Sequence, residues 1–229
     1  MSRVHPTKKK GEDSMSKEKV KEQQHQHPSS VLTVWKRSSM SFQGTDGFTV
    51  FDHHGKLAFR VDNYSRKSTG ITGGGGGGGG VVLMDGAGNA LLTLKPQMQV
   101  FSMHCPWSAY RGDGSSKSNV GTKPKLLFSM RSASIFNGGK DEAEIFMAGH
   151  DTPDFKVQGC FRRRNCIIRD STGAIAARIA RKKVNKTVLL GDDVFALMVQ
   201  PGFHAELIMA FVIILDRIHV KPFTPFLCS

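Results

Sequence analysis

The sequence is poor in cysteine and has no long apolar run at its start, and both shortages exclude classes of protein. Four cysteines among 229 residues are too few for the disulfide framework of a small secreted module. The polar, basic start Met1–Gly11 is not followed by the apolar stretch of a signal peptide. We therefore expect a cytoplasmic protein with free thiols, not a secreted one. A peripheral place at the plasma membrane and entry into the nucleus both stay open.

Motifs of common enzymes are missing as well. The chain has no G-x-S-x-G, H-E-x-x-H or P-loop motif, and its nine histidines are scattered. The eight glycines at 73–80 match a nucleotide-binding pattern only trivially, because no helical pattern follows them. We expect no catalytic residue, no cofactor and no metal site. The glycine run predicts a flexible loop near 65–80, and a polar, turn-rich stretch predicts another near 108–124.

Acidic residues are outnumbered, with 19 Asp and Glu against 32 Lys and Arg, which gives a net charge of +13. Residues 1–30 are basic and almost free of aliphatic side chains, so we expect a disordered tail before a domain at 31–222. Between positions 156 and 186 lie ten basic residues and one acidic residue. The remainder of the domain is nearly neutral, so an electrostatic function would reside in this segment.

The basic segment has a plain interpretation and a functional one. The outward face of a hairpin is often simply charged. Alternatively, the segment binds anionic phospholipid head groups; the candidates are Arg162, Arg163, Arg164, Arg178, Arg181, Lys182 and Lys183. Nucleic acid is disfavoured, because Phe161 is the only aromatic residue among them and base stacking normally needs more.

One sequence unit occurs three times, at 49–61 (TVFDHHGKLAFRV), 82–94 (VLMDGAGNALLTL) and 167–179 (IIRDSTGAIAARI). Each copy is an apolar strand, Asp-x-x-Gly and a second strand. An Asp carboxylate caps its own turn, and Gly supplies the positive φ that a tight turn needs. We predict hairpin turns at three pairs: Asp52 and Gly55, Asp85 and Gly88, Asp170 and Gly173. One carboxylate per turn is too few for calcium.

Alternating or β-branched runs predict about twelve strands, near 31–37, 46–52, 56–62, 81–85, 90–95, 98–103, 125–130, 143–147, 154–160, 165–169, 174–182 and 194–199. A single open sheet of this size would expose hazardous edges, which favours a barrel or a sandwich. A helix is predicted at about 205–217. Its segment Leu207–Leu215 is apolar throughout and therefore on every side. Because a bilayer span needs about 20 apolar residues, we expect this helix to be enclosed by a barrel, not by lipid.

The sequence resembles the plant LURP-one-related family of the Tubby C-terminal-like superfamily, which also contains the phospholipid scramblases. The matching stretches are LTVWKRS (32–38), GFTVFDHHGKLAFRVDNY (47–64), VVLMDGAGNALLTL (81–94), FKVQGCFRRRNCIIRD (155–170), GDDVFALMVQPG (191–202) and ILDRI (214–218). The resemblance implies a mainly β fold, a twelve-stranded antiparallel barrel around a central hydrophobic C-terminal helix.

For function, the resemblance implies a non-enzymatic protein. The superfamily includes membrane-tethered transcription regulators that bind phosphoinositides, and some plant members are linked to defence. We therefore expect a monomer that docks on an anionic membrane surface or on unidentified protein partners. The alternative is a protein-interaction module in plant defence signalling with no lipid binding. A scramblase-like lipid transporter would need the apolar helix to span a bilayer.

Overall fold

The computed structural model describes residues 29–37, 47–62, 80–97, 106–112, 124–133, 141–185 and 188–219, and the structural statements below concern these ranges. They contain twelve strands and one helix. The strands are β1 (Ser30–Arg37), β2 (Gly47–Phe51), β3 (Leu57–Asp62), β4 (Val81–Asp85), β5 (Ala90–Pro96), β6 (Trp107–Arg111), β7 (Leu126–Ser132), β8 (Asp141–Met147), β9 (Phe155–Cys160), β10 (Asn165–Asp170), β11 (Ile175–Arg181) and β12 (Val194–Val199). The helix is α1 (Ala205–His219).

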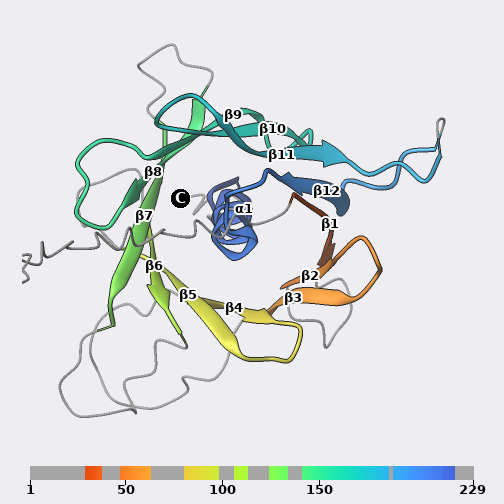
Figure 1. The fold of residues 1–229 in the computed structure, drawn as a ribbon, viewed down its shortest axis with the longest axis horizontal. Helices are drawn as coiled ribbons and strands as arrows, with labels where there is room; N and C mark the ends of the chain where they lie inside the picture. The colour runs from red at the N-terminus through yellow and green to blue at the C-terminus, as the bar shows by residue number, and fades with distance from the viewer. Residues whose placement is uncertain are drawn as a thin grey trace, which may run out of the picture.

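The strands form one closed antiparallel barrel in which each strand pairs with its neighbours in sequence and β1 closes the ring against β12 (Figure 1). At the closure, Val34 of β1 lies between Val50 of β2 and Phe195 of β12. All three side chains are buried, because alternate residues of each strand point into the barrel. The prediction of a closed antiparallel barrel is confirmed.

Helix α1 runs through the centre of the barrel (Figure 1). Its residues from Ile208 to Leu215 are fully buried, so the apolar surface on every side of the helix is covered by the inner faces of the strands. The ring of Phe128 in β7 meets that of Phe211 edge to face, with centroids 4.9 Å apart. The predicted enclosed helix is confirmed. Within the described ranges, no helix has both the length and the hydropathy that crossing a bilayer requires.

The alternation of antiparallel strands divides the connections between the two ends of the barrel. Among the connections that the structure describes, those that follow even-numbered strands lie at one end, together with the start of α1, and those that follow odd-numbered strands lie at the other, together with the end of α1. All three Asp-x-x-Gly segments follow even-numbered strands, namely β2, β4 and β10. We call their end of the barrel the turn end.

The three turns share one geometry. In each, one Asp Oδ1 accepts hydrogen bonds from the backbone N–H groups two and four residues later, at 2.8–3.0 Å; the pairs are His54 and Lys56, Ala87 and Asn89, and Thr172 and Ala174. The glycines Gly55, Gly88 and Gly173 have φ values of 78°, 94° and 87°. The bond from the Lys56 N–H lowers the pKa of Asp52, and the side-chain bond from Asn89 lowers that of Asp85. These turns are therefore stabilised by their own residues.

One strand was not predicted from the sequence, and one predicted loop begins too early. The loop expected near 108–124 overlaps β6, which occupies Trp107–Arg111. Trp107, Ser108 and Ala109 are all buried, so both faces of this strand are covered and it lacks the alternation of apolar and polar residues. Gln97 Nε2 donates a hydrogen bond to the Ser108 hydroxyl. Outside the described residues lie most of the predicted tail 1–30, the loop near 65–80 up to residue 79, the predicted strand 98–103 and residues 113–123 of the second loop.

Candidate functional site

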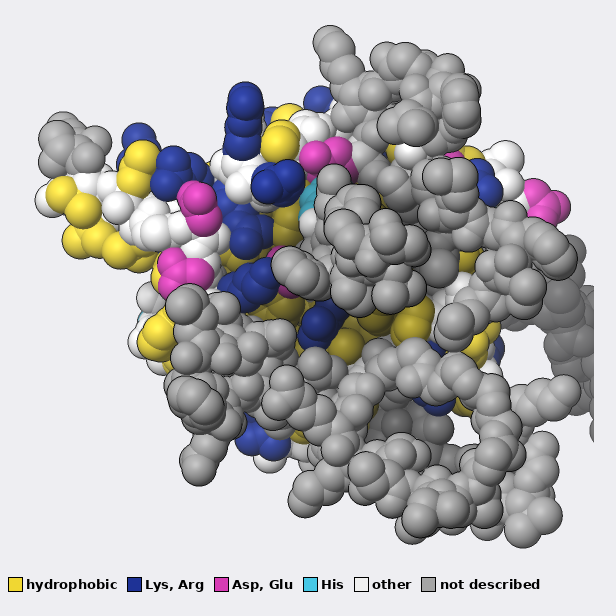
Figure 2. All heavy atoms as spheres, turned by 180° about the vertical axis from the view of Figure 1, so that it is seen from behind, with side chains coloured by type: hydrophobic (Ala, Val, Ile, Leu, Met, Phe, Trp, Pro, Cys, Tyr) yellow, Lys and Arg dark blue, Asp and Glu magenta, His cyan; other side chains and the backbone are white. Residues whose placement is uncertain are grey.

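The predicted binding residues come mainly from two connections at the end of the barrel opposite the turn end. One is the turn Phe161–Arg164 between β9 and β10, and the other follows β11, which ends at Arg181, and begins with Lys182 and Lys183. The strand register brings them together, because Asn165, directly after the turn, lies opposite Ala180. We call this the basic end. Figure 2 shows Lys and Arg side chains gathered on this face, with acidic side chains among them.

Arg164 does not belong to the exposed surface predicted from the sequence. Its side chain is buried, its φ is 52°, and its guanidinium carbon lies 4.4 Å from the ring centroids of both Phe161 and Phe195. The guanidinium Nε donates to the backbone carbonyl of Asp192 at 2.9 Å. Burial lowers the Arg164 pKa, and the nearby Asp216 and Asp192 oppose that change. Arg164 is therefore a structural cation that contacts two aromatic rings, which lie nearly perpendicular to one another.

The other five candidate cations at the basic end differ in exposure and pairing. Arg162, Arg163 and Lys183 are exposed and form no ion pair with any residue that the structure describes. Arg181 pairs with Asp192 at 3.0 Å, and Lys182 Nζ donates to Thr33 Oγ1 at 3.1 Å. Three side chains therefore retain their whole charge for an external anion, and two are partly engaged.

Arg178 is separated from this group. It lies within β11, opposite Ile167 of β10 and Met198 of β12, and it is exposed on the outer wall of the barrel. A strand rises about 3.3 Å per residue, so its Cα is about 10 Å from that of Arg181 along the wall. Arg178 belongs to the side of the barrel and not to the basic end.

Carboxylates at the basic end hold the end of α1. The Asp216 side chain is buried, and its Oδ1 lies 2.8 Å from Lys36 Nζ of β1. This ion pair joins residues 180 positions apart in the sequence and fixes the last turn of the helix to the barrel wall. Breaking it would leave a buried charge unpaired, which is costly.

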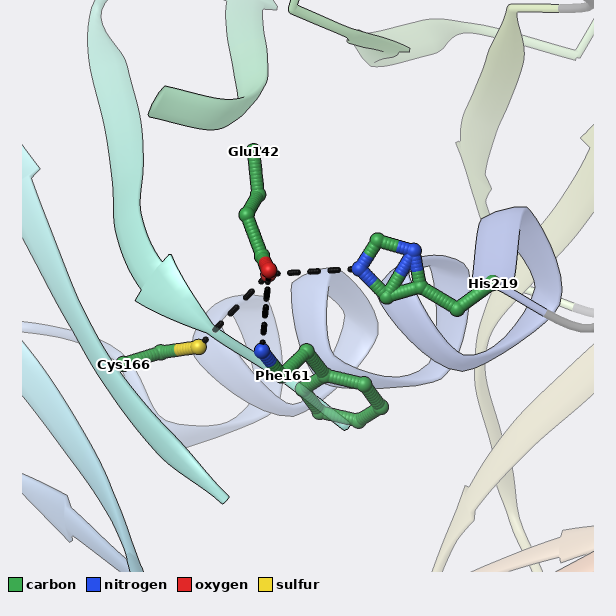
Figure 3. Close-up of polar contacts among 4 residues, drawn as sticks. All are labelled: Glu142, Phe161, Cys166 and His219. Atoms are coloured by element: carbon green, nitrogen blue, oxygen red, sulfur yellow. Dashed lines mark hydrogen bonds and ion pairs between the residues drawn. The ribbon is translucent and has the colours of Figure 1, made fainter. Parts of the chain in front are cut away.

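A second carboxylate, Glu142, collects hydrogen bonds from three elements (Figure 3). It accepts from the Phe161 N–H at 2.9 and 3.0 Å, from the Cys166 thiol at 3.7 Å and from His219 Nε2 at 3.2 Å. Glu142 follows an undescribed segment at the start of β8, Cys166 lies in β10, and His219 ends α1. Glu142 thus links the wall of the barrel to the end of its central helix.

The Glu142 cluster contains Cys, His and Glu but lacks the geometry of an activated thiol. Cys166 and His219 both point at the Glu142 carboxylate, so the imidazole is not placed to take a proton from the thiol. Burial, and secondarily the charge of Glu142, raise the Cys166 pKa well above its ordinary value, which disfavours the reactive thiolate. Among the described residues, no three His, Cys, Asp or Glu side chains are arranged to hold a metal ion.

The comparison with protein families decides what this barrel is. The model of the family described as LURP-one-related matches residues 30–216, which is most of the chain. The chain belongs to the LURP-one-related family.

Its relatives support the same assignment. Protein LURP-one-related 5 of Arabidopsis thaliana is 37% identical over 190 residues, with 82% of each chain covered. Protein LURP-one-related 12 of the same plant is 34% identical over 189 residues and covers 82% of this chain and 77% of its own. A crystal structure of an Arabidopsis thaliana protein, 20% identical, covers 83% of this chain and 91% of its own with a TM-score of 0.53. At that identity the likeness shows the shared fold.

Several features of this LURP-one-related barrel were not predicted from its sequence. The buried position of Arg164, the Glu142 cluster and the ion pair between Lys36 and Asp216 all depend on contacts between distant segments. Cys166 lies opposite Gly159 and Cys160 lies opposite Asn165, so the two cysteines do not face one another across the hairpin. Because neighbouring residues of a strand face opposite sides, Cys166 is buried inside while Cys160 points outward. The only sequence signal for the stacking of Arg164 is the position of Phe161 directly before three arginines.

Proposed function

We propose that this LURP-one-related protein docks reversibly, and without catalysis, on the anionic phospholipid head groups of a membrane through its basic end. The observation that carries the proposal is the convergence of Arg162, Arg163 and Lys183, which are exposed, unpaired within the described structure, and supplied by two connections that the register makes neighbours. Phosphoinositides, the ligands of membrane-tethered regulators in the wider superfamily, are the head groups that we expect.

The strength of such docking follows from the number of charges. Each basic side chain near an anionic membrane contributes about 1 kcal/mol, so three give about 3 kcal/mol, or about a 150-fold preference for an anionic surface. The attraction extends about one Debye length, or about 8 Å at physiological ionic strength. Docking of this strength is reversible and weakens with added salt. The charges of Arg181 and Lys182 lie close enough to add to it.

The test is a charge reversal with a matched control. The variant Arg162→Glu, Arg163→Glu, Lys183→Glu changes the basic end. The control Lys56→Glu, Arg111→Glu, Lys125→Glu makes the same change in net charge at three exposed positions of the turn end. Sedimentation measures the affinity for vesicles that contain phosphoinositides. This affinity should fall about 100-fold in the first variant and little in the second. Equal sedimentation of both variants, or equal binding of the unchanged protein to neutral vesicles, would contradict the proposal.

The second candidate is a protein-interaction module in plant defence signalling that binds no lipid. The acidic residues at the basic end favour it, because Asp192 beside Arg181 gives the surface the mixed charge of a protein interface. Localisation in plant cells separates the two candidates. Docking on a membrane predicts that the Arg162, Arg163 and Lys183 variant leaves the membrane fraction, whereas the interaction module predicts an unchanged distribution.

A further inference from the structure

Beside the basic end, the connection between β11 and β12 forms a hairpin that carries unusual side chains. We call residues Lys182–Leu190 the arm; its described residues are 182–185 and 188–190. Lys183 pairs with Leu189, the Val184 N–H donates to the Val188 carbonyl at 3.0 Å, and the Leu190 N–H donates to the Lys182 carbonyl at 2.9 Å. The arm projects from the barrel wall (Figure 1).

The arm exposes apolar side chains in a way that the rest of the described barrel does not. Val184 is 65% exposed, Val188 48% and Leu189 45%. The other large apolar side chains exposed in the described ranges are Val31 and Trp35, both on the outer wall of β1. Single exposed apolar residues are ordinary, whereas three on one short hairpin mark a contact surface. Val184 and Val188 face one another across the hairpin and form one apolar unit, and Leu189, opposite Lys183, adds apolar surface on the other face.

The charges around this apolar unit indicate what covers it. Lys182 and Lys183 lie at its base, and Arg162 and Arg163 occupy the adjacent turn. The described part of the arm carries no acidic residue. Figure 2 shows apolar side chains on the arm, on the same face as the gathered Lys and Arg side chains. An apolar projection flanked by cations matches the boundary of an anionic bilayer, where acyl chains lie beneath negatively charged head groups.

We propose that the arm inserts Val184, Val188 and Leu189 into the acyl boundary of an anionic bilayer while the neighbouring cations contact its head groups. This inference rests on the proposed function and adds a second source of affinity. Coulombic attraction is screened by salt, and burial of apolar surface is not. Binding therefore has two components: a salt-sensitive one from the basic end, and one from the arm that persists at high salt once the protein is docked.

The arm variant Val184→Ser, Val188→Ser, Leu189→Ser tests the insertion. Its control is a pair of single variants, Val188→Ser and Val31→Ser. Val31 is as exposed as Val188, at 47%, but it lies at the start of β1, at the turn end. On vesicles of phosphatidylcholine with phosphatidylserine, we expect the triple variant to bind about 30-fold more weakly than the unchanged protein. Val188→Ser should bind about threefold more weakly, and Val31→Ser should bind like the unchanged protein.

A spectroscopic measurement reports insertion directly. With Val184→Trp, the difference in emission from the unchanged protein isolates the new indole from Trp35 and Trp107. Insertion predicts a shift to shorter wavelength on anionic vesicles, kept when salt is added after docking. No shift, together with unchanged binding of the triple serine variant, would overturn insertion; loss of binding in the Arg162, Arg163 and Lys183 variant would then still support electrostatic docking.

Two other outcomes also decide the question. If the unchanged protein binds no anionic vesicle, both the insertion and the proposed function fail. If the protein instead forms a dimer by analytical ultracentrifugation and the triple serine variant is monomeric, the arm is a contact between two copies of the chain, and the insertion is wrong.

Discussion

The two ends of the barrel differ in how the connections between their strands are stabilised. At the turn end, Asp52, Asp85 and Asp170 each bond to backbone groups within their own turn. At the basic end, Arg164, Glu142 and Asp216 bond to distant segments and to the end of α1. Because its bonds are local, each turn is stabilised by its own residues and contributes little to the stability of neighbouring segments. Long-range bonds make the basic end a single unit, and this unit carries the exposed cations.

Two glycines with positive φ give the largest expected contrast between the ends. Gly159 in β9, near the basic end, has a φ of 111°, and an added Cβ would collide with the backbone carbonyl of Asn165. Gly173 at the turn end has a φ of 87° and open space around it. Gly159→Ala should lower the free energy of unfolding by about 3 kcal/mol or more, and Gly173→Ala by about 1 kcal/mol.

Urea denaturation of both glycine variants measures this difference. Gly173→Asn serves as a further control, because Asn tolerates the left-handed conformation and should cost less than Ala. Equal midpoints for Gly159→Ala and Gly173→Ala would show that Asn165 moves aside and that the neighbourhood of the basic end is no more rigid than the turn end.

The buried cation of the basic end provides the next contrast. Arg164→Ala removes the guanidinium between Phe161 and Phe195 and leaves the Asp192 carbonyl without this donor, so we expect a loss of about 2–3 kcal/mol in the free energy of unfolding. Arg162→Ala, two residues earlier and exposed, should change it by less than about 0.5 kcal/mol. The midpoint of urea denaturation at neutral pH is the measurement. Similar losses in the two variants would mean that the stacked position of Arg164 contributes little.

The smallest expected effect is a pH dependence of stability that arises at the turn end. The pKa values of Asp52 and Asp85 are lower in the folded chain than their ordinary value of about 3.9, so these carboxylates stabilise the fold above that pH. Their contribution is lost as the pH falls through the folded pKa. The double variant Asp52→Asn, Asp85→Asn should therefore be less stable than the unchanged protein at pH 7, with a difference that shrinks below about pH 4.

The Arg164→Ala variant is the control for that pH series. Its deficit should persist across the range, because a guanidinium stays charged at every pH tested. Urea midpoints from neutral pH down to about pH 3 measure both variants. A difference for the double aspartate variant that does not change with pH would contradict the role assigned to the two carboxylates.

The same division explains how much could be predicted from the sequence. The Asp-x-x-Gly turns and the helix at Leu207–Leu215 are visible because their determinants are neighbours in the chain. The barrel follows from alternation along most strands, but in β6 the polar Ser108 is buried together with Trp107 and Ala109, and in β4 the residues from Val81 to Met84 are all buried. Local patterns therefore predicted the fold, but they did not predict β6, most of which lies in the expected loop.

The candidate site was harder, because the sequence shows where charge lies but not which charges are exposed. Arg162, Arg163 and Arg164 are equivalent in a list of residues, and only the fold places Arg164 between two rings and leaves the others in water. The apolar residues of the arm look like an ordinary short strand until the structure places them outside the barrel. Which cations are exposed is decided by contacts between distant segments of the barrel.

The pairing of β1 with β12 has a consequence for synthesis of the protein. The first strand cannot pair with β12 until β12 has been synthesised. Helix α1, which fills the interior, emerges from the ribosome after both strands. A ring of strands without its helix would present its apolar lining to water, so a partly synthesised chain gains little by closing. We therefore expect the barrel to close in one late step, after α1 has been synthesised.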